Sequence, residues 1–164
     1  MRRRARGSTP TSRALETAIT EIEGGAGCVL TPSGASAVAL AILSVVKAGD
    51  HILMVDSAYA PTRRLCDTFL LKMNIETEYY APNIGAGIVD KLRDNTSLIF
   101  TESPGSQTFD VQDIPAICAV AKTHNVKTAI DNTWASPLYF DPFSHGIDLS
   151  AQALTKYVVG HADA

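Results

Sequence analysis

The chain has 164 residues, of which 46% are hydrophobic and 19% are charged, and its formal net charge is −3. This length suits one domain, and the composition is that of a soluble globular protein, with no apolar run near the roughly 20 residues that span a membrane. The weak negative charge gives no overall attraction to nucleic acid, so we expect neither a nucleic-acid-binding protein nor a membrane protein.

Residues 1–11 are expected to form an N-terminal arm, and residues 12–164 part of one domain. The arm carries four arginines among its first six residues, which could bind an anion or simply form a solvated terminus. No apolar segment follows them, so the start predicts no signal peptide. The three cysteines form no CxxC pair, which favours a reducing cytoplasm, and Cys28 and Cys118 lie in apolar surroundings typical of a core.

The first predicted helix ends at Gly24-Gly25, because apolar residues recur on one helical face up to that point. These residues are Leu15, Ala18, Ile19 and Ile22. The short apolar run 28–30 then meets Thr31-Pro32-Ser33-Gly34, which predicts a strand-to-helix junction. An Ala-rich helix follows over about residues 35–47.

The rest of the chain alternates between strand and helix patterns. Strands are predicted over residues 51–55, 76–80, 97–100, 127–130 and 147–149, and helices over about 61–73, 87–93 and 114–124. Strands that read as continuous apolar runs and alternate with helices are typical of a parallel sheet covered on both faces. We therefore predict an α/β fold with a mostly parallel sheet flanked by helices.

Polar residues follow several of these apolar runs, in the clusters 31–36, 56–59, 102–107 and 131–134. In an open parallel sheet, ligands bind beyond the carboxyl ends of the strands. The clusters therefore indicate a ligand site at this edge. The four histidines are scattered without the spacing of metal ligands, so we expect no metal.

Ser33-Gly34-Ala35-Ser36 begins the second helix and is a candidate phosphate cradle. A helix N-terminus presents unpaired amides and partial positive charge, and Gly34 lets a ligand approach the backbone. Many α/β turns look the same and bind nothing. The segment lacks the Gly-Lys-Ser/Thr of a Walker loop and the second glycine of a nucleophile elbow.

Asp131 and Lys156 are candidates for the chemistry. Asp131 follows an apolar strand, where its carboxylate could pair with a pyridinium nitrogen or cap a turn. Lys156 lies in an apolar stretch, where desolvation would make its amine nucleophilic, although the spacing alone favours a lysine that extends to solvent. Tyr59 and Trp134, at strand ends, could stack on a flat ring or pack at the rim.

Taken together, these residues resemble the Cys/Met-metabolism family of pyridoxal-phosphate enzymes, from about Arg6 to Ala164. The most specific part is Ile130-Asp131-Asn132-Thr133-Trp134-Ala135, followed 25 residues after Asp131 by Thr155-Lys156-Tyr157 and Gly160-His161-Ala162-Asp163. Earlier matches are Ile22-Glu23-Gly24-Gly25, Ser33-Gly34-Ala35, Ala58-Tyr59 and Glu102-Ser103-Pro104. Gly105-Ser106 after this last turn and Trp134 are similar to the cystathionine β-lyase branch, since γ-synthases and γ-lyases usually carry Asn-Pro and Phe or Tyr there.

The resemblance implies the large pyridoxal-phosphate-binding domain of fold-type I, aspartate aminotransferase-like enzymes, incomplete at its C-terminus and without the small C-terminal domain. It implies that Lys156 binds pyridoxal 5'-phosphate covalently and later moves the substrate proton. Asp131 would pair with the ring nitrogen, and Tyr59 would stack on the ring.

The resemblance also implies that groups from two subunits hold the phosphate. In one subunit these are the amides of Gly34 and Ala35 and the hydroxyl of Thr155. Arg6 would reach the phosphate site of the neighbouring subunit, so the expected assembly is a homo-oligomer, a tetramer built from dimers. Arg4 stands where the family has a tyrosine that assists phosphate binding.

The implied reaction is α,β-elimination, which converts L-cystathionine to homocysteine, pyruvate and ammonia in the cytoplasm, a step toward methionine. The substrate class is small amino-acid thioethers. Alternatives are a γ-synthase or γ-lyase of the same family, and an inactive fragment that keeps only cofactor or subunit binding. The chain ends eight residues after Lys156, where family members continue, so we expect this chain alone to be unstable or inactive.

Overall fold

The computed structural model describes residues 9–161, which contain one five-stranded sheet in the order β2-β1-β3-β4-β5. All neighbouring strands are parallel, as predicted. The strands are β1 (His51–Val55), β2 (Glu76–Tyr80), β3 (Thr96–Glu102), β4 (Lys127–Asp131) and β5 (Leu149–Ala151). The predicted α/β class is therefore confirmed.

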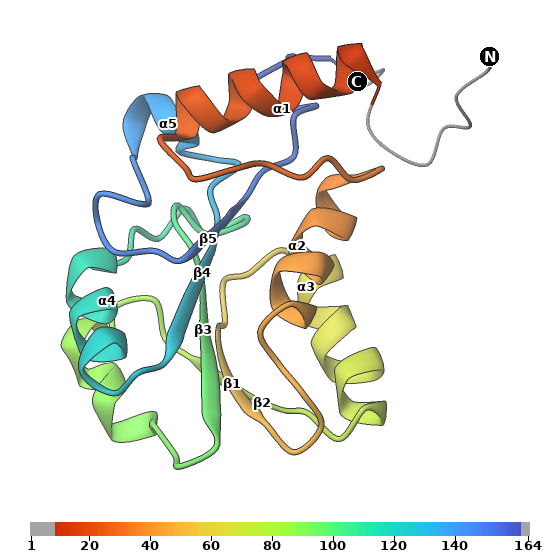
Figure 1. The fold of residues 1–164 in the computed structure, drawn as a ribbon. Coiled ribbons are helices and arrows are strands. Elements are labelled where there is room, and N and C mark those ends of the chain that lie inside the picture. Colours follow the sequence, from red (N-terminus) through yellow and green to blue (C-terminus); the bar gives the residue numbers. More distant parts are fainter. Residues whose placement is uncertain (1–8, 162–164) are drawn as a thin grey trace.

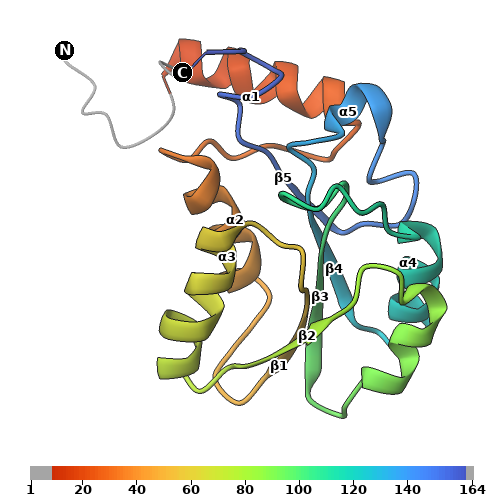
Figure 2. The ribbon, with the colours of Figure 1, turned by 180° about the vertical axis from the view of Figure 1, so that it is seen from behind.

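Helices cover both faces of the sheet, with α2 and α3 on one side and α4 and η2 on the other (Figure 1, Figure 2). Two further helices, α1 and α5, lie beyond the carboxyl ends of the strands (Figure 1). The helices are α1 (Pro10–Glu23), α2 (Gly34–Leu43), α3 (Ala60–Arg64), η1 (Leu65–Leu70), η2 (Gly85–Lys91), α4 (Ile114–Thr123) and α5 (Ser136–Tyr139).

The central strands are largely buried, as expected where helices cover both faces of a parallel sheet. Every residue of β1 is buried. The side chains of Leu98, Ile99 and Phe100 in β3 have no solvent exposure, and burying each contributes about 1.5–3 kcal/mol relative to an exposed position. The edge strand β2 is more polar, and its Glu78 forms ion pairs with Lys91 and Arg93.

The ends of α1 follow from local chemistry. The side chain of Thr9 accepts a hydrogen bond from the amide of Ser12, and Pro10 needs no amide partner at the first turn. The helix stops at Gly24, whose φ of 68° is a left-handed conformation that glycine adopts without strain. The helix begins at Pro10, within the segment predicted as the N-terminal arm.

The predicted strand over residues 28–30 is wrong. Residues 26–30 form no strand, and Val29 is 72% exposed, because the described sheet ends at β5 and offers these residues no strand partner. Cys28 is only half-buried, so its predicted place in the core is also wrong, whereas Cys118 is buried. The strand predicted over residues 147–149 begins two residues later, at Leu149.

Two predicted α-helices have a different helical form. The helix predicted over residues 61–73 starts as α3 and continues as a π-helix in η1. The helix predicted over residues 87–93 is the 3-10 helix η2. Apolar spacing reports which side chains share a face and does not separate these hydrogen-bond patterns. Within residues 9–161, no helix is long and apolar enough to span a membrane.

Candidate functional site

Two buried acids end neighbouring strands at the carboxyl edge of the sheet. Glu102 is the last residue of β3 and Asp131 the last of β4, and the two are register partners. They are only 3% and 9% exposed. Glu102 accepts hydrogen bonds from the amide of Tyr59, at 2.8 Å, and from the hydroxyl of Ser106, while the amide of Thr133 donates to Asp131 Oδ1 at 3.0 Å.

Burial makes ionisation of both acids costly. Desolvation raises the pKa of Glu102 to about 7, and the charge of Asp131 adds to the increase, although hydrogen bonds from Ser106 and Tyr59 oppose it. Desolvation also raises the pKa of Asp131, against a hydrogen bond from Thr133. Among the residues that the structure describes, neither acid forms an ion pair. This edge therefore favours a cationic ligand.

The loop that carries Lys156 runs beside the turn that carries Asp131. The amide of Asn132 donates to the carbonyl of Ala151, and the amide of Ala153 donates to Thr133 Oγ1, each over 2.9 Å. Residues 154–159 then form turns. Thr133 thus contacts both segments, since its amide binds the acid and its hydroxyl binds the loop.

Lys156 is exposed, which agrees with a lysine that extends to solvent and not with one buried in its apolar stretch. It follows β5, the edge strand of the described sheet, where nothing among residues 9–161 covers it. The lysine side chain is therefore accessible to a ligand.

The N-terminus of α2 lies against the same loop. Ser33 caps the helix by accepting the amide of Ser36, while the amides of Gly34 and Ala35 have no acceptor within the helix. A Cβ on Gly34 would lie 2.6 Å from the Cβ of Ala153, so glycine allows this close packing. The free amides and the half-buried Thr155 therefore belong to one region, which suits a phosphate group.

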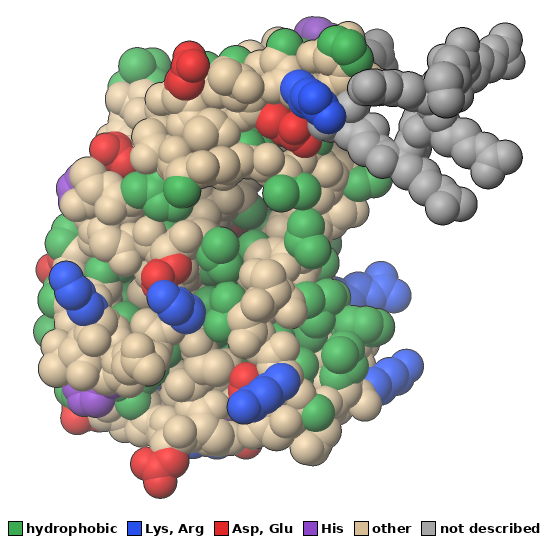
Figure 3. Space-filling model, viewed as in Figure 1, with side chains coloured by type: hydrophobic (Ala, Val, Ile, Leu, Met, Phe, Trp, Pro, Cys, Tyr) green, Lys and Arg blue, Asp and Glu red, His purple; other side chains and the backbone are tan. Residues whose placement is uncertain are grey.

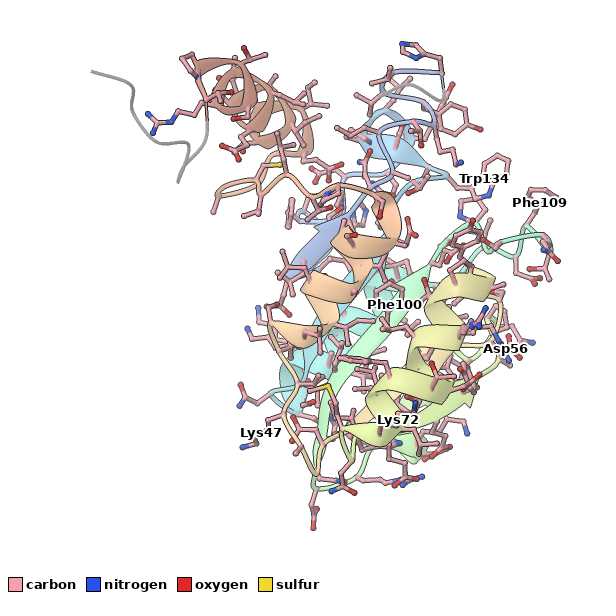
Figure 4. The ribbon with its side chains drawn as sticks, turned by 90° about the vertical axis from the view of Figure 1, so that its right-hand side faces the viewer. Lys47, Asp56, Lys72, Phe100, Phe109 and Trp134 are labelled. Atoms are coloured by element: carbon pink, nitrogen blue, oxygen red, sulfur yellow. The ribbon has the colours of Figure 1, made fainter. Side chains whose placement is uncertain are left out.

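Aromatic side chains surround this edge. Tyr59 immediately precedes α3 and is 50% exposed, and the bond from its amide to Glu102 fixes its backbone. Trp134 packs edge-on against Phe109, with ring centroids 5.1 Å apart, and its ring lies 6.0 Å from that of Tyr157, next to Lys156. Figure 4 shows Trp134 and Phe109 side by side beyond the sheet, whereas Phe100 points into the interior.

An apolar groove of about 340 Å³ is lined by Trp134, Pro104, Val111 and Tyr139. Lys and Arg side chains are scattered over the face seen in Figure 3 rather than gathered in one patch.

Arg6 lies outside the described residues. No group of three or more potential metal ligands occurs within residues 9–161.

These features fit a flat basic ring that carries a phosphate. The buried Asp131 suits a protonated ring nitrogen, the start of α2 suits the phosphate, and the amine of Lys156 lies on the loop that contacts both. The fold and the site together define a class, the parallel α/β domains that hold such a cofactor at the carboxyl edge of the sheet.

The family is shown directly by sequence. The pattern of the family described as "Cys/Met metabolism PLP-dependent enzyme" matches residues 3–164, and this chain belongs to that family. Pyridoxal phosphate is the cofactor of the family, which confirms the cofactor expected from the sequence.

Curated relatives carry lyase names. A Saccharomyces cerevisiae protein named "Putative cystathionine beta-lyase" is 56% identical over 94% of this chain and 46% of its own length. The Escherichia coli protein "Cystathionine beta-lyase MetC" is 48% identical over 97% of this chain and 41% of its own length. The predicted resemblance is therefore confirmed, and this chain spans less than half the length of these relatives.

A solved structure from Campylobacter jejuni, of a "putative O-acetylhomoserine (thiol)-lyase", matches with a TM-score of 0.87 and 32% identity. The match covers 93% of this chain and 38% of that one, and the Campylobacter jejuni protein carries a pyridoxyl group on a lysine. This likeness confirms the expected fold-type I architecture. The different activity in its name shows that the fold and the family leave the substrate open.

Proposed function

We propose that this chain carries the cofactor-binding part of a carbon–sulfur lyase that performs α,β-elimination on L-cystathionine. The products are homocysteine, pyruvate and ammonia. The observation that carries the proposal is the contact between the Asp131 turn and the Lys156 loop through Thr133, because it holds the segments that carry the acid and the amine side by side. The β-lyase names of the relatives and Trp134 at its position in the turn support the choice of reaction.

Lys156 has two tasks in this proposal. Its amine would hold the cofactor covalently, and once free the same amine would take the proton from the substrate α-carbon. Bound pyridoxal phosphate supplies an acceptor for the electron pair left at that carbon. The bond from the β-carbon to sulfur would then break, and the sulfur would leave as a thiolate that takes up a proton to give homocysteine. Water would hydrolyse the remaining aminoacrylate to pyruvate and ammonia.

The other residues hold and orient the ring. Asp131 keeps a proton on the ring nitrogen, because a buried carboxylate without a cation binds that positive charge strongly. Tyr59 covers one ring face. The amides of Gly34 and Ala35, with the hydroxyl of Thr155, bind the phosphate.

The reaction is tested by giving the purified lyase that contains this chain pyridoxal phosphate and L-cystathionine and measuring both keto acids. Pyruvate is expected from α,β-elimination, and Lys156→Ala should abolish it. Lys122→Ala, an exposed lysine on α4, is the matched control and should keep full activity. Production of 2-oxobutyrate without pyruvate would contradict the β-lyase proposal.

The second candidate is a γ-synthase or γ-lyase, which the name of the Campylobacter jejuni structure favours. The third is a chain that binds cofactor or a partner subunit without turnover. Cofactor absorbance without either keto acid would support the third candidate.

The subunit arrangement is also a proposal. We propose a cytoplasmic homo-oligomer in which Arg6 of one subunit binds the cofactor phosphate of its neighbour. Arg6→Ala should then weaken cofactor binding in the assembled protein by about tenfold, the effect of losing one charge-assisted bond. An unchanged cofactor affinity in a protein that still assembles would contradict this role.

A further inference from the structure

Glu102 connects three parts of the site. One carboxylate oxygen accepts the amide of Tyr59, 2.8 Å away, and the other accepts the hydroxyl of Ser106. Its own backbone carbonyl accepts the side-chain amide of Gln112 at 2.8 Å. Because the side chain is 3% exposed, these bonds are shielded from water and hold their partners firmly.

The two loops that Glu102 joins also pack directly on each other. The amide of Ser106 donates to the carbonyl of Ser57 at 2.9 Å. A Cβ on Gly105 would lie only 2.7 Å from the Cβ of Ser57, so the close approach depends on glycine. The bond from Tyr59 to Glu102 is therefore part of a rigid junction, and this junction sets where the backbone of Tyr59 lies.

Glu102 also lies on the same side of the sheet as Asp131. Register partners in neighbouring parallel strands direct their side chains to the same face, and Glu102 is the partner of Asp131. Neither oxygen of Glu102 has a cationic partner among the described residues. When ionised, Glu102 therefore adds its negative charge to that of Asp131 at the place where the ring nitrogen would be held.

We propose that Glu102 is a positioning residue of the cofactor site. It fixes the backbone of Tyr59 so that the tyrosine ring lies over the cofactor, and its charge assists Asp131 in holding the protonated ring nitrogen. This inference rests on the proposed function, since it requires pyridoxal phosphate to bind between Asp131 and Lys156.

The test compares Glu102→Gln with Glu102→Ala. Glutamine keeps an oxygen for the amide of Tyr59 and removes the charge, whereas alanine removes both. The exposed Glu21→Gln on α1 is the matched control for charge. The single tryptophan, Trp134, lies beside the ring of Tyr157, the residue after Lys156. Its fluorescence should therefore report pyridoxal phosphate binding.

Glu102→Gln should weaken pyridoxal phosphate binding by about tenfold, and Glu102→Ala by roughly a further tenfold, since each step removes interactions with a charged or buried partner. The absorbance of bound cofactor should titrate at lower pH in Glu102→Gln. The variant lacks a negative charge that stabilises the protonated form of the cofactor. A role confined to the fold would not move this midpoint.

Two outcomes separate the two levels of inference. If the unaltered protein binds no pyridoxal phosphate, the proposed function itself fails. If the unaltered protein binds it and Glu102→Gln shows the same affinity and the same absorbance midpoint, only the role of Glu102 is overturned. Because glutamine resembles the protonated acid, this variant should fold even if Glu102→Ala does not.

Discussion

Replacing Glu102 by glutamine should stabilise the cofactor-free protein at pH 8 and leave its stability nearly unchanged near pH 4.5. Burial raises the pKa of Glu102 from 4.5 to about 7. Below pH 4.5 the acid is protonated in both the folded and the unfolded state. As the pH rises from 4.5 to 7, the unfolded state loses its proton first, so the stability of the folded state falls.

The magnitude follows from the size of this shift. Each pKa unit corresponds to about 1.4 kcal/mol, so the shift costs the folded protein on the order of 3 kcal/mol above pH 7. The side chain is 3% exposed, so solvent screens little of this cost. Glutamine mimics the protonated acid at every pH and does not carry the cost. The ionised carboxylate of Glu102 is also the form that would strengthen cofactor binding. The same charge therefore lowers the folding stability of the cofactor-free protein and favours pyridoxal phosphate.

The assay is urea unfolding of the two proteins between pH 4.5 and 8.5, without cofactor, followed by the fluorescence of Trp134. The difference in free energy of unfolding should grow with pH and level off above pH 7. Glu21→Gln should show no such trend. A difference that is constant with pH, or one that grows toward low pH, would refute the reasoning about the charge of Glu102.

Three other substitutions test the packing around the site. Gly34→Ala should cost about 1–3 kcal/mol in urea unfolding and weaken pyridoxal phosphate binding, because its Cβ would strike Ala153; an unchanged affinity would contradict the proposed phosphate site. Thr133→Val should weaken cofactor binding severalfold in a fluorescence titration, since the amide of Ala153 loses its acceptor. Phe100→Ala should cost about 3–5 kcal/mol in urea unfolding, and a loss under about 1 kcal/mol would contradict its place in the core.

The sheet could be predicted from the sequence because its strands carry continuous apolar runs. The predicted bounds of β1 and β2 agree with the structure, and β3 and β4 are longer than predicted by a few residues that are still buried. Residues 28–30 carry an equally apolar run and form no strand. A strand needs a neighbour, and the sequence of a segment does not reveal whether one is present.

The site was predictable where a motif was specific. Asp131 is buried at the end of a strand as expected, and its turn contacts the loop of Lys156. The exposure of Lys156 could not be read from its apolar neighbours, because it depends on which segments cover the loop. Glu102 was assigned no role, although it ends an apolar strand as Asp131 does. That shared position was the available signal, and only the strand register shows that the two acids are partners.

The central claim is that the amine of Lys156 holds the cofactor that Asp131 anchors. The most direct test is to mix the protein with pyridoxal phosphate, reduce it with borohydride, digest it and locate the pyridoxyl group by mass spectrometry. The label should be found on the peptide that contains Lys156, and its yield should fall in Asp131→Asn. A label on another lysine, or on none, would contradict the account.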